Sequence, residues 1–153
     1  MDDAAFSLSS RSAWTAPEIA AFLTRYRAPL RLAANTRSGF PSVCSLWFRY
    51  TKGRIFCATN SRARIATLLR NDPRCAFELA PNDPPYFGVR GQGRATLVTN
   101  GAGELLGELI DRYLGSRTTD LARWLLARAA DEVAICIEPE WLSSWDYSAR
   151  MQD

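Results

Sequence analysis

One short stretch of this sequence gathers side chains that bind anions: Thr59-Asn60-Ser61-Arg62-Ala63-Arg64. A run rich in strand formers precedes it, and Ile65, Leu68 and Leu69 follow at helical spacing, which predicts a strand-to-helix junction. A helix N-terminus offers free N–H groups and positive partial charge. Arginines in the first helical turn are unfavourable by roughly a few tenths of a kcal/mol unless an anion is present. The stretch indicates a phosphate site, with an ordinary helix cap as the alternative.

A second candidate group lies in the glycine-rich run over 86–98, where Arg90 and Gln92 place a cation and an amide near three glycines. Glycines inside a strand mark a bulge or the close approach of a backbone or ligand. Two interpretations stay open. Tyr86, Arg90 and Gln92 are either core and surface positions of a long strand, or contacts to a substrate and cofactor from a second subunit. The G-x-x-G-x-G spacing is not a dinucleotide-binding fingerprint.

The composition argues against several other kinds of site. The chain has 153 residues and no histidine, so it lacks the commonest general acid and base and the usual partner of a Ser or Cys nucleophile. Redox chemistry carried by a cofactor requires less of the protein. Four cysteines lie far apart and never in C-x-x-C spacing, which predicts buried free thiols and no metal site. A reactive thiol at Cys44 or Cys57 is the alternative.

Charge and hydropathy indicate the partners. The net charge of +3 comes from eighteen arginines and one lysine, and arginine suits bidentate pairing with phosphate or carboxylate. These arginines are scattered and not clustered with aromatic residues, so we expect no nucleic-acid partner. An acidic N-terminus and the absence of a long apolar run predict a cytoplasmic protein with no membrane partner. We expect one domain over 1–153, with 1–14 as a flexible segment.

The elements that must position these residues are short strands paired as hairpins, with helices between them. Thr15 to Glu18 has the pattern of a capping box, so a helix is expected over 16–27. Thr51-Lys52-Gly53 is a predicted hairpin turn. This arrangement indicates an antiparallel α+β barrel and not a doubly wound parallel sheet. Other helices are expected from Asn60 or Ser61 to about 72, over 101–114 and over 118–129, and strands over 30–34, 43–48, 54–59, 75–79, 86–98, 133–137 and 141–147.

Several further segments of the sequence form motifs that can be compared with those of known families. They are Gly39-Phe40-Pro41, Ser45-Leu46-Trp47-Phe48, Ile55-Phe56-Cys57-Ala58-Thr59, Asn71-Asp72-Pro73-Arg74, the run from Pro84 to Ala95 and the terminal Trp145-Asp146-Tyr147-Ser148. Together with the stretch from Thr59 to Arg64, they resemble the pyridoxamine 5′-phosphate oxidase-like family of FMN-binding split-barrel proteins, in its flavin and deazaflavin oxidoreductase branch. The resemblance covers most of residues 16–150, and the later segments are similar to those of bacterial members.

This resemblance implies an antiparallel split β-barrel with peripheral helices, working as a homodimer. FMN, or in some branches FAD or a deazaflavin, would lie in a groove at the dimer interface, with Arg64 as the main ligand of its phosphate. One departure is that Ile65 follows Arg64 where many members have a second cation, a role that Arg62 could fill. The other cofactor-binding residues that the resemblance implies are Thr59, Asn60, Ser61 and Arg62 at the phosphate, Ser45, Leu46 and Trp47 along the isoalloxazine ring, and Arg90 and Gln92 from the partner subunit.

The function expected from the resemblance is a flavin-dependent oxidoreductase, in which the bound flavin passes hydride or electrons to an unknown small-molecule substrate. No side chain need act as an acid or a base in such a reaction. The alternative is a non-catalytic protein that binds a flavin, a deazaflavin, haem or another tetrapyrrole, because a shared fold does not establish chemistry.

Overall fold

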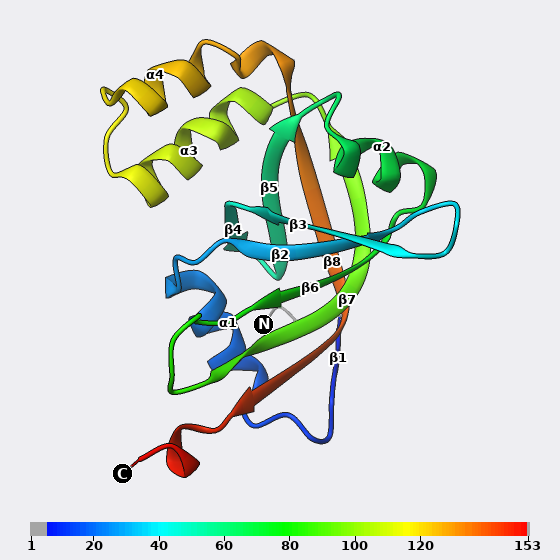
Figure 1. Ribbon diagram of the computed structural model, residues 1–153, viewed down its shortest axis with the longest axis vertical. Coiled ribbons are helices and arrows are strands. Elements are labelled where there is room, and N and C mark those ends of the chain that lie inside the picture. The colour runs from blue at the N-terminus through cyan, green and yellow to red at the C-terminus, as the bar shows by residue number, and fades with distance from the viewer. Residues whose placement is uncertain (1–5, 153) are drawn as a thin grey trace.

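The computed structural model describes residues 6–152, in which a curled sheet carries helices at its ends and on one side (Figure 1). The strand order is β3-β2-β6-β7-β8-β5-β4 with antiparallel neighbours, and β1 pairs in parallel with β8. The predicted α+β split barrel with peripheral helices is confirmed. The strands are β1 Ser7–Leu8, β2 Leu30–Asn35, β3 Pro41–Leu46, β4 Phe48–Thr51, β5 Arg54–Asn60, β6 Arg74–Leu79, β7 Phe87–Val98 and β8 Glu132–Asp146. The α-helices are α1 Ala16–Arg25, α2 Arg64–Asn71, α3 Ala102–Leu114 and α4 Asp120–Leu126.

Helix α1 forms where the capping box places it. The Glu18 carboxylate accepts the backbone N–H of Thr15 at 2.8 Å, which satisfies a donor that the first turn leaves free. Ile19, Phe22 and Leu23 are buried on its inner face. The helix ends at Arg25, two residues before the predicted end, because Tyr26 already has an extended backbone conformation.

The prediction of one strand over 43–48 is wrong, because the chain breaks at Trp47. Strand β3 ends at Leu46 on one edge of the sheet, and β4 begins at Phe48 on the opposite edge. The side chain of Phe48 is fully buried, whereas the Trp47 ring stacks on Tyr113 of α3 with centroids 5.1 Å apart. These two anchors, in different parts of the protein, turn the chain from one half of the barrel to the other.

The hairpin that follows the break agrees with the prediction. Lys52 and Gly53 both have positive φ, at 49° and 74°, which is the conformation of a tight two-residue turn between antiparallel strands. Gly53 adopts this conformation without strain because it has no Cβ.

The two strands predicted over 133–137 and 141–147 are one strand, so that division is wrong. Strand β8 runs without a break and pairs with β7, β5 and β1. Its pairing with β7 shifts between Gln92 and Gly93, which pair with Trp141 and Pro139. A bulge at this point accommodates a proline, which lacks the N–H that a regular ladder needs.

The glycines of β7 allow close approach, and what approaches is the protein itself. A Cβ on Gly91 would lie 2.5 Å from side-chain atoms of Phe77 and Leu142 in the core. A Cβ on Gly88 would lie 2.7 Å from the ring of Trp145. Gly91 therefore serves side-chain packing, and Gly88 also allows close approach of the Leu79 carbonyl, 2.6 Å from the position of its Cβ.

The segment 1–14, predicted to be flexible, is partly placed by contacts with β8, while residues 1–5 lie outside the described residues. Ser7 and Leu8 pair with Trp141 and Leu142. The backbone N–H of Trp14 donates to Oγ of Ser144 at 2.7 Å, and the Ser12 and Ser144 hydroxyls are 2.9 Å apart.

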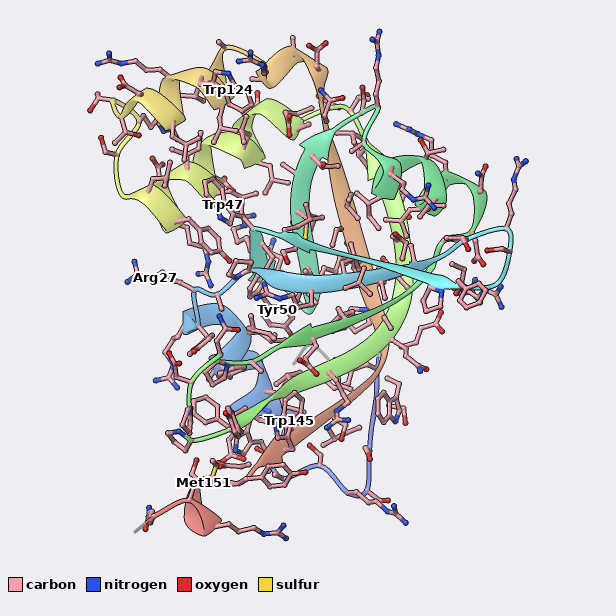
Figure 2. All side chains as sticks on the ribbon, in the orientation of Figure 1. Arg27, Trp47, Tyr50, Trp124, Trp145 and Met151 are labelled. Carbon is pink, nitrogen blue, oxygen red and sulfur yellow. The ribbon has the colours of Figure 1, made fainter. Side chains whose placement is uncertain are left out.

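The main core fills the barrel, and a second apolar region lies outside it. Strands β2, β6 and β7 direct alternate residues inward, and α2 adds Ile65 and Leu69 to this core. Helices α3 and α4 pack against Trp47 and Ala58 on the outer side of β5 (Figure 2). Among residues 6–152, no helix is long and apolar enough to cross a membrane, and no three metal-ligating side chains gather in one place.

Candidate functional site

The predicted phosphate site is a compact turn between β5 and α2, over residues 60–64, here named the phosphate turn. The side-chain oxygen of Asn60 accepts the N–H of Arg62 at 2.9 Å, and its carbonyl accepts the N–H of Ala63 at 2.9 Å. The helix therefore begins at Arg64 and not at Asn60 or Ser61, because a polar side chain closes the turn first. Thr59 and Asn60 belong to β5, and Arg62 lies in the turn and outside the first helical turn predicted for it.

The turn is tied to the chain that leads into β8. The N–H of Ser61 donates to the carbonyl of Asp131 at 2.8 Å, and Arg70 of α2 donates to the carbonyl of Ser61 at 2.8 Å. Both backbone groups of Ser61 are thus occupied. These bonds fix the turn in place, so the positions of Arg62 and Arg64 are set by the sheet and the helix together.

The first turn of α2 has backbone N–H groups without hydrogen-bond acceptors. The N-cap Ala63 has no side chain that can accept a hydrogen bond, and the N–H groups of Arg64, Ile65 and Ala66 have no partner among residues 6–152. The side chains of Arg62 and Arg64 are exposed, and within the described chain neither forms an ion pair. Free N–H groups beside two unpaired cations are groups that can bind an anion such as phosphate.

One acidic residue lies close to this site. Glu132 pairs with Asn60 across the β5–β8 ladder. Burial raises the pKa of Glu132, and the neighbouring Asp131 raises that pKa further. A raised pKa makes the Glu132 carboxyl easier to protonate, which lessens its repulsion of a bound anion.

The departure at Ile65 has a structural reason. Its side chain is only 7% exposed and packs in the main core, in the same cluster as Leu69 of α2. An apolar side chain at this position stabilises the attachment of α2 to the barrel. The cations at the turn are consequently Arg62 and Arg64, with Arg70 engaged by Ser61.

Of the three residues predicted along the flavin ring, Trp47 packs against the strand that leads to the turn. Ser45 is exposed on β3, and Leu46 packs partly against the main core. Trp47 shares an apolar cluster with Ala58, the residue before Thr59 in β5. The structure therefore brings Trp47 and the phosphate turn to the same part of the barrel.

Arg90 and Gln92 lie elsewhere. Gln92 pairs with Trp141, which is eight residues along β8 from Val133, the partner of Thr59. At about 3.3 Å per residue this is roughly 26 Å along the strand. The guanidinium of Arg90 lies over the ring of Trp145, 4.4 Å from its centroid. A single chain does not bring these two residues to the phosphate turn.

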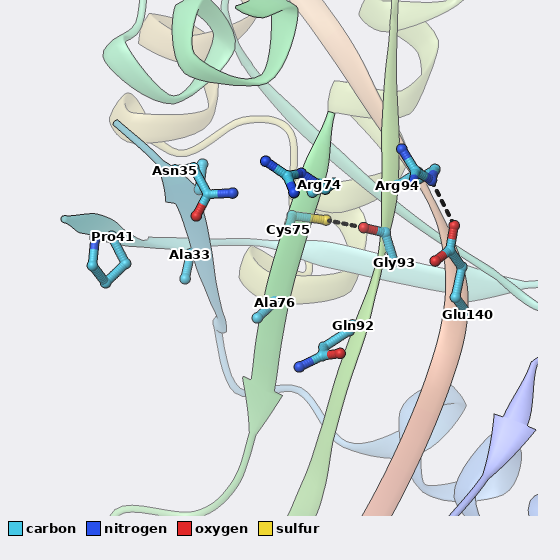
Figure 3. A pocket seen from close by; sticks show the side chains of 11 residues that line it. Ala33, Asn35, Pro41, Arg74, Cys75, Ala76, Gln92, Gly93, Arg94 and Glu140 are labelled. Carbon is cyan, nitrogen blue, oxygen red and sulfur yellow. Dashed lines mark hydrogen bonds and ion pairs between the residues drawn. The ribbon is translucent and has the colours of Figure 1, made fainter. Parts of the chain in front are cut away.

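Gln92 instead lines a cavity of about 280 Å³ on the outer face of the sheet, here named the outer-face cavity (Figure 3). Its floor is formed by Ala33 and Ala76, and its rim carries Arg74 and Arg94. Both arginines are paired: Arg94 with Glu140 at 2.7 Å, and Arg74 with Asp72 at 2.8 Å.

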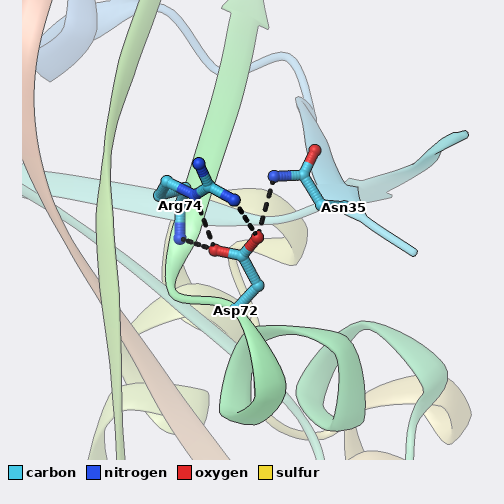
Figure 4. Close-up of polar contacts among 3 residues, drawn as sticks. All are labelled: Asn35, Asp72 and Arg74. Atoms are coloured by element: carbon cyan, nitrogen blue, oxygen red, sulfur yellow. Dashed lines mark hydrogen bonds and ion pairs between the residues drawn. The ribbon is translucent and has the colours of Figure 1, made fainter. Parts of the chain in front are cut away.

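The pair of Arg74 and Asp72 belongs to a small network (Figure 4). Asp72 accepts two side-chain hydrogen bonds from Arg74 and one from Asn35. These bonds hold the pKa of the Asp72 carboxyl well below its usual value. The carboxylate therefore stays ionised and keeps Arg74 neutralised.

The thiols offer little reactivity. Burial raises the pKa of Cys75 to about 12, and it raises the pKa of the fully buried Cys57 as well. Since the thiolate is the reactive form, these groups are inert at neutral pH. Burial also raises the pKa of the half-buried Cys44, so the alternative of a reactive thiol at Cys44 or Cys57 gains no support.

The sequence interpretation missed the contribution of α3. Tyr113 stacks on Trp47, and its hydroxyl donates to the carbonyl of Ala28 at 2.9 Å. The neighbouring Arg112 donates to the carbonyls of Thr24 and Tyr26 at the end of α1. Nothing in the sequence distinguishes these residues from an exposed helical face, because their partners are distant in the chain.

Comparisons with known proteins agree with the fold. No protein-family model and no curated protein matches the chain. A conserved hypothetical protein of Mycobacterium tuberculosis is 24% identical, with a TM-score of 0.78 and 96% of this chain and 94% of that chain covered. An F420 reductase is also 24% identical, with a TM-score of 0.68 and coverages of 79% and 93%. A Listeria innocua protein named for pyridoxamine 5′-phosphate oxidase is 17% identical, with a TM-score of 0.65 and coverages of 84% and 95%.

The chain has the pyridoxamine 5′-phosphate oxidase-like split-barrel fold. At this level of identity the likeness concerns the fold alone. What this split barrel binds has to be argued from its own residues.

Proposed function

We propose that this split-barrel protein is a flavin-dependent oxidoreductase, which binds FMN or a related flavin such as FAD or a deazaflavin and acts on a small-molecule substrate. The observation that carries the proposal is the phosphate turn. Three N–H groups without a partner in residues 6–152 lie there beside Arg62 and Arg64, which form no ion pair with those residues. A flavin phosphate would satisfy both the donors and the charges.

A homodimer completes the site in this proposal. Measured along β8 from Val133, which pairs with Thr59, the residues paired with Gln92 and Arg90 lie roughly 26 Å and 33 Å away. In this proposal both side chains reach the cofactor from a second chain. The hairpin of β2 and β3 exposes Phe40 by 76% and Val43 by 65%, which are apolar contacts suited to a second copy. Gel filtration should give the mass of a dimer. A monomer that still binds flavin would contradict this part of the proposal.

The cofactor would supply the redox chemistry, and the chain would hold and orient it. Arg64 and the free N–H groups bind the phosphate. Trp47, held in place by Tyr113, limits where the ring can lie and excludes water from one side of it. With no histidine in the chain, the protein contributes binding and orientation and no imidazole acid or base.

The test begins with the purified protein. We expect flavin absorbance, or saturable binding of added FMN, FAD or deazaflavin, and mass spectrometry of the released cofactor identifies it. Arg64→Ala should weaken binding by roughly 10- to 150-fold, since a hydrogen bond to a charged group contributes about 1.5 to 3 kcal/mol. The control is Arg11→Ala, an exposed arginine in the segment beside the far end of β8. A protein that ignores all three cofactors refutes the proposal.

Turnover needs a separate measurement. NAD(P)H or a reduced deazaflavin is added to the loaded protein, and the flavin spectrum is followed before and after addition of candidate acceptors. An enzyme is reduced by a donor and reoxidised by its substrate. A loaded protein that no donor reduces is a carrier, the alternative to an oxidoreductase.

A further inference from the structure

A cleft of about 400 Å³ lies between α1 and the far ends of β7 and β8, and the proposed flavin site does not use it. It is here named the α1 cleft. Asp146 on its rim is thirteen residues along β8 from Val133, the partner of Thr59, which is roughly 43 Å of strand. The volume is in the range of small-molecule sites. In one chain the α1 cleft and the phosphate turn are therefore separate places.

One wall of the α1 cleft is aromatic. Trp14, Phe22 and Phe87 line it, with the Trp14 centroid 5.0 Å from that of Phe22 and 6.0 Å from that of Phe87. Phe22 and Phe87 meet edge to face at 5.9 Å. Phe22 is buried, whereas Trp14 and Phe87 remain partly accessible. Such a wall suits a flat apolar ring, and its faces also attract cations.

The negative end of the α1 cleft is formed by two carboxylates held beside Trp14. Asp146 accepts the indole N–H of Trp14 at 3.2 Å and the N–H of Ser148 at 2.9 Å. Glu18 is held by the N–H and hydroxyl of Thr15. Hydrogen bonding to Thr15 lowers the pKa of Glu18, and hydrogen bonding to Ser148, with a smaller contribution from Trp14, lowers the pKa of Asp146, so both are ionised at neutral pH.

The positive end is formed by Arg25, also on α1. It lies seven residues after Glu18 on the same helix, which is about 10 Å along the axis at 1.5 Å per residue. The Nε of Arg25 donates to the carbonyl of Ala21 at 3.3 Å. Its terminal nitrogens form no ion pair or hydrogen bond with residues 6–152, so they remain able to bind a ligand carboxylate.

We propose that the α1 cleft binds a small aromatic zwitterion, a molecule with an ammonium group at one end of a ring and a carboxylate at the other. The ring lies against Trp14 and Phe87, the ammonium meets Glu18 and Asp146, and the carboxylate meets Arg25. The charges of the rim favour this class over a neutral or singly charged ligand, because each ligand charge faces an opposite one. The site goes beyond the proposed flavin function and does not depend on it.

The test is isothermal titration calorimetry at low ionic strength with three probes: 4-(aminomethyl)benzoate, benzylamine and 4-methylbenzoate. We expect the zwitterion to bind tighter than either singly charged probe by roughly tenfold, which corresponds to about 1.4 kcal/mol. Asp146→Asn should weaken the binding of the zwitterion and of benzylamine and leave the binding of 4-methylbenzoate unchanged. Arg25→Gln should weaken the binding of the zwitterion and of 4-methylbenzoate and leave the binding of benzylamine unchanged.

Matched controls are Asp120→Asn and Arg123→Gln on α4, exposed residues away from the α1 cleft, which should change nothing. Every variant is titrated both free of flavin and after incubation with it, and circular dichroism checks its fold. Binding that survives in protein without bound flavin keeps this site distinct from the flavin proposal. No saturable heat with any probe, or binding that Asp146→Asn and Arg25→Gln leave unchanged, overturns the inference.

Discussion

The phosphate turn and the outer-face cavity each present two arginines, yet they differ in what those arginines contact. Arg74 and Arg94 at the outer-face cavity are paired with Asp72 and Glu140 (Figures 3 and 4). Arg62 and Arg64 at the turn form no ion pair within residues 6–152 and lie beside free N–H groups. In a chain with eighteen arginines, residue type alone does not identify an anion site. The neighbouring groups distinguish the two regions, because Asp72 and Glu140 offset the charge of the cavity arginines and no ion pair within residues 6–152 offsets Arg62 or Arg64.

The largest effect should come from removing both cations at the turn. The double variant Arg62→Ala and Arg64→Ala should weaken flavin binding by roughly a hundredfold or more, because two charge-assisted contacts to the phosphate are lost. The double variant Arg74→Ala and Arg94→Ala should lose much less affinity for flavin, because Asp72 and Glu140 already pair with these arginines. Fluorescence titration with FMN compares them. Equal losses in the two variants would break the contrast between the two regions.

A smaller effect is expected from Glu132 beside the turn. Its pKa is raised in the folded chain, so protonation stabilises the fold, and this stabilisation is lost as pH rises through the folded pKa. Protonation also removes a negative charge near the phosphate. Glu132→Gln should therefore strengthen FMN binding at neutral pH by roughly two- to fivefold, the size of one screened charge interaction.

The measurement for Glu132→Gln is the FMN dissociation constant between pH 5 and 8. The gain over the unmodified chain should shrink as pH falls, since the phosphate titrates in both proteins and only Glu132 differs. Asp120→Asn is the control for a general change of charge. A gain that is constant across this range would show that Glu132 does not titrate near the phosphate.

The smallest effect should come from making the outer-face cavity more like the phosphate turn. Asp72→Asn removes the charge that neutralises Arg74, so the outer-face cavity should gain weak affinity for inorganic phosphate. Millimolar phosphate should then raise the thermal midpoint of this variant more than that of the unmodified chain.

The ion pair of Asp72 and Arg74 also predicts that the stability of the fold depends on pH. Because the pKa of Asp72 is lowered in the folded chain, its contribution to stability is present above the unfolded pKa and is lost as pH falls through the folded pKa. Acid unfolding of Asp72→Asn should show less loss of stability with falling pH than the unmodified chain. An identical acid profile would mean that this ion pair contributes nothing to stability.

The elements that sequence patterns predicted best are those fixed by nearby residues. The capping box of Thr15 and Glu18 begins α1, and the two positive-φ residues Lys52 and Gly53 close the hairpin. The break at Trp47 was missed because Tyr113, which holds the ring, lies in a distant helix. The late start of α2 was missed because the side chain of Asn60 closes a turn before the helix can begin.

Local patterns in the sequence determined an antiparallel α+β barrel, the strand-to-helix junction and the arginines at it, because periodicity and capping act over a few residues. The resemblance of its motifs to a known family added the split-barrel type. Only the tertiary structure decided which arginines are unpaired, since Glu140 reaches Arg94 from another strand. Tertiary structure also separated Gln92 from the phosphate turn and joined Asp146 to Trp14. These pairings join residues far apart in the chain, and local patterns carry no record of them.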